Sequence, residues 1–156
     1  MGIKNNKMNQ GMVDISEKDV TKRIAAAYGQ IKMSRQAFQA LVDRRSPKGD
    51  VLDTAKIAGI MAAKSTPAII PMCHPLELNK VSVELQPDKR SSSVKIHSEV
   101  VCFGRTGVEM EALTAVAASA LTVYDMMKWA DKAMVISDIK LLRKSGGKSG
   151  EFRRSS

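Results

Sequence analysis

The segment from Val108 to Trp129 constrains the fold of this chain more than any other part of the sequence. Thirteen residues without a charge, ALTAVAASALTVY, separate Glu111 from Asp125, and neither glycine nor proline interrupts them. Because alanine and leucine are good helix formers, the segment predicts a long helix that is apolar on nearly all sides. Such a helix is normally buried, and charged groups at its ends are costly unless they are paired or functional.

The charged groups at the two ends of this helix cannot contact the same small ligand within one chain. Glu111 and Asp125 are 14 residues apart, and the standard helical rise converts this spacing to about 21 Å. Either the two ends serve different sites, or one site is assembled from two chains.

Asp125 and Lys128 are three residues apart, so they share a helix face and can form an ion pair. An ordinary surface pair of this kind is common and contributes only roughly a few tenths of a kcal/mol. Because the rest of the face is apolar, we expect this pair to lie in a cleft. There the carboxylate would hold the lysine charged, or desolvation would make the lysine a base near neutral pH.

Glu109 and Glu111 flank Met110 at the start of the same helix. Acidic side chains at a helix N-terminus interact with free N–H groups and with the helix dipole, and this is the ordinary interpretation. In a second interpretation, the two glutamates accept hydrogen bonds from the donor edge of a guanine-like ring.

Cys73 and His74 lie side by side in the loop PMCHP, which two prolines fix. A nucleophilic cysteine with a histidine base is disfavoured, because adjacent side chains rarely point the same way. A zinc site is also disfavoured, because His97 and Cys102, the further soft ligands, are five residues apart on a predicted strand and face opposite sides. His74 as a proton shuttle or phosphate donor, and a core cysteine beside a loop histidine, remain equally open.

Two basic segments are candidate phosphate ligands. Lys48 lies between Pro47 and Gly49 at a predicted helix start, where backbone N–H groups can bind an anion. The tail KSGGKSG, with Lys144 and Lys148, resembles a phosphate loop but lacks the first glycine and the following helix of that motif. It is either a solvated tail or a flexible lid over phosphates.

Hydrophobic patterns predict the order strand, two helices, two strands, helix, strand. In the first strand one face carries Ala25, Ala27, Gly29, Ile31 and Met33. Ser34 and Asp50 are candidate caps for the next two helices. The predicted strands are 23–33, 79–86, 93–103 and 135–142. The predicted helices are one that follows Ser34 and ends before Pro47, one at 51–64 and one at 108–129. This order is typical of an α+β fold, a ferredoxin-like antiparallel sheet with helices packed on one face.

The helix at 51–64 has an apolar side that consists of Ala55, Ile57, Ala58, Ile60 and Met61. The chain of 156 residues suits one domain. We expect this domain at 11–152, with a disordered N-terminus at 1–10 and a flexible C-terminus at 153–156.

Net charge and cysteine content restrict partners and compartment. The net charge of +9 favours an anionic partner. For most of the lysines, however, the ordinary interpretation is that they keep the protein surface solvated. The cations are spread along the chain, and the 79–86 and 93–103 strands lack the surface aromatics on which an RNA-binding sheet stacks bases. We therefore expect no nucleic acid partner. No apolar run is long enough for a membrane span, and the N-terminus lacks the apolar centre of a signal peptide. Two cysteines do not make a disulfide framework, so we expect a location in the reducing cytoplasm.

Seven motifs, in this order along the chain, resemble those of the cyclic pyranopterin monophosphate synthases, the MoaC family of molybdenum cofactor biosynthesis. They are MVDIS at 12–16, KGDV at 48–51, AGIMAAK at 58–64, MCHPL at 72–76, TGVEMEALTAV at 106–116, YDMMK at 124–128 and KSGGKSG at 144–150. The resemblance covers residues 11–152. Departures such as Arg105 and the proline in RRSP at 44–47 bear on loop shape and affinity rather than on the reaction.

The resemblance implies conversion of 3′,8-cyclo-7,8-dihydro-GTP to cyclic pyranopterin monophosphate with release of diphosphate. It also implies a homohexamer, a trimer of dimers with sites at the dimer interface, and no cofactor, metal, nucleic acid or membrane. By position, Asp125 and Lys128 match the catalytic residues of the family. The residues that match its substrate contacts are Met72, Cys73, His74, Met110, Glu111, Glu109, Lys48, Lys144 and Arg23. Lys128 would then move protons, and the basic residues would meet the triphosphate or support chemistry.

Two other functions remain open on the residues alone. A non-catalytic nucleotide-binding module would bind guanine nucleotides without turnover, and an RNA-binding α+β domain would show salt-dependent affinity for RNA. Neither alternative accounts for Asp125 with Lys128 alongside His74 and Glu111.

Overall fold

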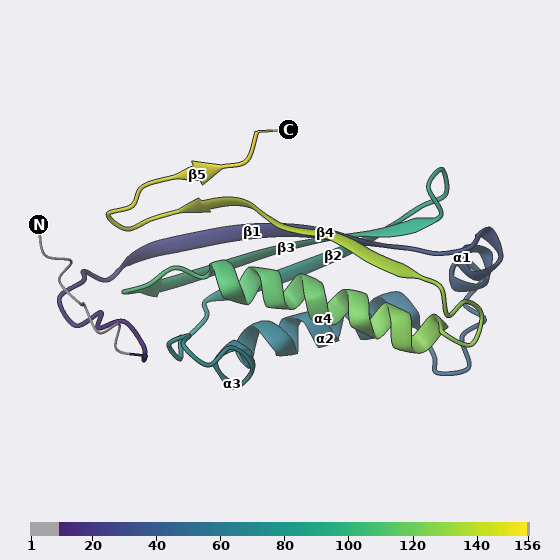
Figure 1. Cartoon of the computed structure of the whole chain (residues 1–156), viewed down its shortest axis with the longest axis horizontal. Coiled ribbons are helices and arrows are strands. Elements are labelled where there is room, and N and C mark those ends of the chain that lie inside the picture. The colour runs from purple at the N-terminus through teal and green to yellow at the C-terminus, as the bar shows by residue number, and fades with distance from the viewer. Residues whose placement is uncertain (1–9, 156) are drawn as a thin grey trace, which may run out of the picture.

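In the computed structural model, which describes residues 10–155, helices pack on one face of an antiparallel sheet (Figure 1). The strands are β1 (Thr21–Lys32), β2 (Lys80–Asp88), β3 (Ser93–Gly104), β4 (Val135–Ser145) and β5 (Phe152–Arg153). The helices are α1 (Arg35–Val42), α2 (Val51–Lys64), α3 (Thr66–Ile69) and α4 (Glu109–Met127). The sheet order β2-β3-β1-β4-β5 contains the ferredoxin-like arrangement of the first four strands, which confirms the predicted fold class.

The central strand β1 carries the core of the sheet. It pairs with β3 on one side and with β4 on the other, and the predicted face from Ala25 to Met33 is buried at every second residue. A Cβ atom on Gly29 would lie 2.6 Å from Val116 Cγ1 of α4. The absence of a side chain at Gly29 therefore lets α4 pack directly on the middle of β1.

The apolar side predicted for α2 is only partly the buried side. Ala55 is buried, but Ile57 and Met61 are each 58% exposed. The helix instead packs on α4 through small residues, because Gly59 leaves room for Ser119 and the Ala115 carbonyl. The larger apolar side chains of α2 therefore remain on the surface.

Several predicted boundaries shift. The helix α4 and the caps Ser34 and Asp50 are confirmed, since each cap side chain accepts a backbone hydrogen bond. The helix α3 and the strand β5 were not predicted. The strand β4 continues to Ser145, and β5 pairs with its end after the turn at 146–150. The disorder expected at 1–10 lies outside the described residues, apart from Gln10.

Among residues 10–155, no helix is both long enough and apolar enough to cross a membrane.

The contact between α2 and α4 predicts a penalty for Gly59→Ala. Alanine favours a helix by up to about 1 kcal/mol over glycine. A Cβ atom here would overlap Ser119 Oγ and lie 2.9 Å from the Ala115 carbonyl oxygen. Because backbone cannot move aside easily, overpacking of about 1–3 kcal/mol should prevail and lower the free energy of unfolding.

Urea unfolding of Gly59→Ala measures this penalty. Gly11→Ala is the matched control, since a Cβ atom there meets nothing within 4 Å. A Gly59→Ala variant as stable as the unsubstituted protein would contradict close packing between the two helices.

Candidate functional site

The C-terminal end of α4 presents a carboxylate between two ammonium groups. Lys48 Nζ donates a hydrogen bond of 2.7 Å to Asp125 Oδ2, and Lys128 Nζ donates one of 2.8 Å to Oδ1. The spacing of Asp125 and Lys128 predicted their pair, whereas Lys48 comes from the loop before α2, 77 residues away. We refer to Lys48, Asp125 and Lys128 as the lysine–aspartate cluster.

Electrostatics in this cluster favour the charged forms of its members. Hydrogen bonds from Lys128 and Lys48 lower the pKa of Asp125 to about 2, and the bond to Asp125 raises the pKa of Lys128. Of the two interpretations of this pair, the free chain therefore matches a lysine held protonated by its carboxylate. Both side chains are 50% exposed, so one chain alone does not enclose them in the expected cleft.

The N-terminal end of α4 carries a second group of charged residues. Lys144 Nζ lies 3.5 Å from Glu109 Oε1 and donates a hydrogen bond of 2.6 Å to Ser149 Oγ. The Glu109 carboxylate folds back over Gly107, where a Cβ atom would overlap it. A glycine before the helix is therefore needed for this position of Glu109.

Glu111 is buried next to these groups, with 3% of its surface exposed. Burial raises its pKa above the ordinary value, and the charge of Glu109 adds to the effect. Burial and the Glu111 charge likewise raise the pKa of the Cys73 and Cys102 thiols. A raised thiol pKa disfavours the thiolate and hence a nucleophilic Cys73, whereas a carboxyl of raised pKa is suited to proton transfer.

Arg23 is a buried cation that pairs with no carboxylate of the residues described. Arg23 is only 7% exposed, and its Nε donates a hydrogen bond of 3.2 Å to the Gly104 carbonyl. Within residues 10–155 it forms no ion pair. Gly147 of the glycine-rich turn packs against the guanidinium, leaving no room for a Cβ atom. A buried charge of this kind is costly without an anion, so this position is suited to a negatively charged ligand.

A cavity of about 400 Å³ opens beside Arg23. Its lining residues are Lys18, Asp19, Thr21, Arg23, Gly147, Lys148 and Ser149. The Thr21 hydroxyl is buried and, in the described part of the chain, has no hydrogen-bond partner. Two lysines, an arginine and a free hydroxyl against one aspartate make this cavity suitable for an anion.

His74 belongs to the same end of the molecule. Its Nε2 lies 2.8 Å from the Val13 carbonyl, and since a carbonyl can only accept, this nitrogen carries a hydrogen. The structure thus ties the PMCHP loop to the N-terminal segment. Within residues 10–155, no three His, Cys, Asp or Glu side chains come together as metal ligands do.

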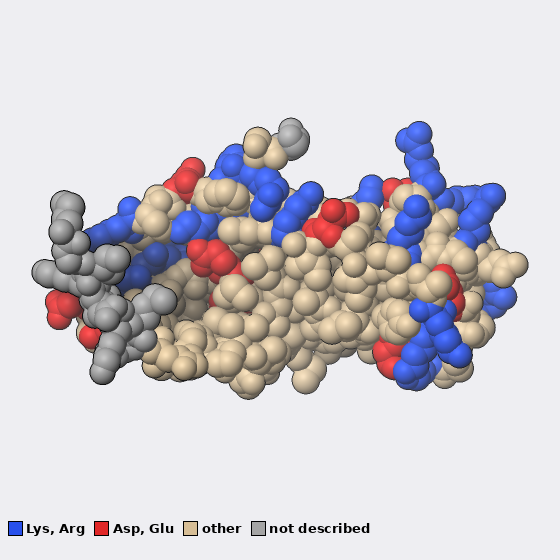
Figure 2. All heavy atoms as spheres, viewed as in Figure 1, with Lys and Arg blue, Asp and Glu red and all other residues tan. Residues whose placement is uncertain are grey.

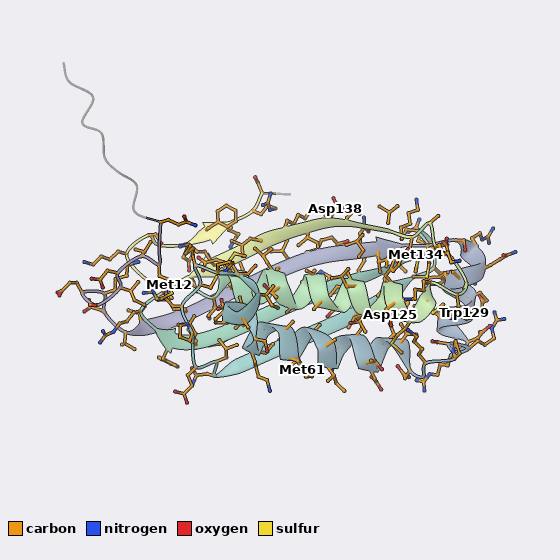
Figure 3. The ribbon with its side chains drawn as sticks, turned by 60° about the horizontal axis from the view of Figure 1, so that its bottom comes forward. Met12, Met61, Asp125, Trp129, Met134 and Asp138 are labelled. Carbon is orange, nitrogen blue, oxygen red and sulfur yellow. The ribbon has the colours of Figure 1, made fainter. Side chains whose placement is uncertain are left out.

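The candidate residues therefore form two groups at opposite ends of α4. The lysine–aspartate cluster is one group. The other, which we call the glutamate–arginine cluster, lies at or near the N-terminal end and comprises Arg23, Cys73, His74, Glu109, Glu111 and Lys144, with the partly exposed Met72 and Met110 nearby. Asp125 and Trp129 lie at one end of the molecule and Met12, next to the partner of His74, at the other (Figure 3). Because α4 is continuous between Glu111 and Asp125, the separation of about 21 Å holds.

An apolar surface lies between the two clusters. On the face of the molecule that Figure 2 shows, few charged side chains lie over the middle of α4 and α2. Ile57 and Met61 of α2 and Leu121 of α4 are exposed there, Leu121 at 62%. Exposed apolar surface of this kind commonly marks a protein interface.

Two contacts of the candidate residues were not predicted from the sequence. Ser149 accepts the bond from Lys144, and the buried Ser46 donates to the Met126 carbonyl at 2.9 Å beside Asp125. For Ser46 a signal was present, because Ser-Pro-Lys-Gly at 46–49 is a favourable β-turn sequence.

The sequence matches the family model described as the MoaC family over residues 12–147. Similar proteins named cyclic pyranopterin monophosphate synthase occur in several bacteria. That of Desulfatibacillum aliphaticivorans is 57% identical over 141 residues, 90% of this chain and 89% of the relative. That of Staphylococcus carnosus is 54% identical over 153 residues (97% and 95%), and that of Rhodospirillum rubrum 54% identical over 147 residues (94% and 89%).

The raised pKa of Glu111 predicts that Glu111→Gln stabilises the fold at neutral pH. The folded protein retains this proton at a pH where the unfolded chain, with a value near 4.5, has lost it. Ionisation of Glu111 therefore opposes folding increasingly as the pH rises above that value. Glutamine keeps the shape of the side chain and removes the charge.

Urea unfolding across acid and neutral pH measures this effect. We expect Glu111→Gln to exceed the unsubstituted protein in free energy of unfolding near neutral pH, with a difference that vanishes below the unfolded pKa. Glu17→Gln, at an exposed position, is the control and should change little. A loss of stability for Glu111→Gln at neutral pH would show that the carboxylate is instead stabilised in the fold.

Proposed function

The chain belongs to the MoaC family, and on this premise we propose that it acts as a cyclic pyranopterin monophosphate synthase in molybdenum cofactor biosynthesis. The substrate is 3′,8-cyclo-7,8-dihydro-GTP, and the products are cyclic pyranopterin monophosphate and diphosphate. The enzyme is then a phosphorus–oxygen lyase. The observation that supports this activity most is the pair of lysines bound to Asp125 at the C-terminal end of α4. Glu111 and Arg23, which are both buried, lie near the N-terminal end of this helix.

The reaction needs proton transfer during the rearrangement of guanine to a pterin. Lys128, held by Asp125, is the proposed acid and base, and Lys48 shares the same carboxylate. In the free chain Lys128 is protonated, which suits the donation of a proton first. Enclosure by substrate and a second chain would lower the lysine pKa and allow the return step.

The reaction also needs cations where the cyclic phosphate closes. A substrate hydroxyl forms a bond to the α-phosphorus while the bond to the departing diphosphate breaks, and negative charge accumulates on the leaving oxygens. Arg23 and Lys144, with Lys148 at the cavity beside Arg23, are the proposed stabilisers of this charge. Arg23 is buried and, in the part of the chain that the structure describes, pairs with no carboxylate, which supports this role.

The remaining candidates contact the substrate ring in this proposal. Glu111 and Glu109 accept hydrogen bonds from the donor edge of the guanine-derived ring, and His74 donates or accepts at its phosphate or sugar. Met72, Cys73 and Met110 provide apolar contacts around it. Met72 and Met110 are 45% and 37% exposed, which leaves them free to meet a ligand.

We also propose that each complete site is formed by two chains. One substrate cannot span about 21 Å along a single α4. A second copy packed antiparallel on the apolar surface of α2 and α4 would bring its lysine–aspartate cluster to the glutamate–arginine cluster of the first. A trimer of such dimers is the proposed hexamer, and its cytoplasmic location is consistent with the two unpaired cysteines.

The proposal predicts turnover of the enzymatically prepared substrate. Incubation should release diphosphate and give a product that becomes a fluorescent pterin on oxidation. Asp125→Ala and Lys128→Ala should each lose activity, by roughly a hundredfold or more, as expected for removal of a catalytic acid–base pair. Lys56→Ala, an exposed lysine of α2, is the matched control and should keep full activity.

Different outcomes separate the alternatives. Binding of the substrate without release of diphosphate would replace the synthase by a nucleotide-binding module. Retention of most of the turnover by Lys128→Ala would remove this lysine from the catalytic role while leaving the activity in place.

A further inference from the structure

The loop that carries Lys48 is fixed where it leaves α1. The Arg44 N–H donates to the Leu41 carbonyl at 3.1 Å, and the Arg45 N–H donates to the Ala40 carbonyl at 2.9 Å. Arg44 has a φ of 56°, the left-handed conformation that ends many helices with this pair of bonds. The loop therefore leaves α1 in one defined direction.

A β-turn then presents Lys48. The Gly49 N–H donates to the Ser46 carbonyl at 3.2 Å, which closes the turn from Ser46 to Gly49. Serine, proline and glycine are favoured at its first, second and fourth positions. Gly49 has a φ of 106°, a conformation that side chains rarely adopt, and Asp50 then caps α2.

The Ser46 side chain joins this turn to the end of α4. Its hydroxyl donates to the Met126 carbonyl at 2.9 Å and accepts from the Lys48 N–H at 3.3 Å. Ser46 is only 9% exposed. The Met126 carbonyl is one of the last four of the helix, which have no partner inside it, so the hydroxyl satisfies a group that would otherwise be buried unpaired.

We propose that Ser46 is a positioning residue, whose hydroxyl holds the Lys48 turn against the last turn of α4 so that Lys48 reaches Asp125. One hydroxyl contacts the backbone of Lys48 and of the residue next to Asp125. The lysine side chain has several rotatable bonds, and a fixed backbone removes part of the freedom that its ion pair must restrict. Ser46 thus organises the 2.7 Å contact between Lys48 and Asp125 before substrate binds.

The catalytic test, which rests on the proposed function, is a double-mutant cycle. Ser46→Ala should lower kcat/KM by roughly tenfold, since displacement of a catalytic group by a fraction of an ångström has effects of this order. Ser46→Thr keeps the hydroxyl and should retain most of the activity. In a Lys48→Ala background, Ser46→Ala should cause no further loss, because its effect passes through Lys48.

Additive losses in this cycle would overturn the proposal, since they would show that Ser46 acts on activity independently of Lys48. Thermal unfolding of each variant separates a loss of fold from a loss of position. If Lys48→Ala has no measurable turnover, the same cycle is measured on substrate affinity.

A second readout does not depend on turnover. Lys48→Ala should raise the pKa of the Asp125 carboxyl from about 2, because one of its two hydrogen-bond donors is lost. Ser46→Ala should move this pKa in the same direction, and Ser46→Thr should not, as followed by NMR titration of the Asp125 side chain. An Asp125 titration unchanged by Ser46→Ala would overturn the role of Ser46, even if the protein turned out to lack synthase activity.

Discussion

The rigidity of α4 is the constraint on which the rest of the structure depends. The helix is continuous from Glu109 to Met127, packs on β1 at Gly29 and on α2 at Gly59, and contains neither proline nor glycine. Its length therefore fixes Glu111 and Asp125 about 21 Å apart. In the proposed function, this distance leaves each chain with two separate groups of candidate side chains, and a second chain completes each site.

The two ends of α4 place their acids in opposite environments. Asp125 is exposed, accepts bonds from two lysines and has a lowered pKa, whereas Glu111 is buried and has a raised pKa. A carboxyl that stays ionised and a second one that can hold a proton are a suitable combination for acid–base chemistry. In the proposed dimer, the antiparallel packing of two chains would bring these unlike carboxyls to the same substrate, whose phosphates would compensate Arg23.

The sequence predicted those features that depend on regular spacing. Alternation identified the buried face of β1, the uninterrupted apolar run identified α4, and a spacing of three residues identified the pair of Asp125 and Lys128. The approach of Lys48 to Asp125 depends on the tertiary fold, and it was not predicted from the sequence. For α2, hydrophobicity alone misled, because Gly59 and its small neighbours pack on α4 while Ile57 and Met61 remain outside. The buried Ser46 was missed because its partner, the Met126 carbonyl, is a backbone group 80 residues away.

A mixing experiment tests the two-chain site most directly. Asp125→Ala and Glu111→Ala are each inactive in this account, but a mixed dimer has one site in which both clusters are intact. Dissociation and reassembly of the two variants together should therefore restore activity, to roughly a quarter of the unsubstituted level for random pairing of two symmetric chains. Activity that stays at the level of the separate variants, although mixed oligomers are shown to form, would contradict a site assembled from two chains.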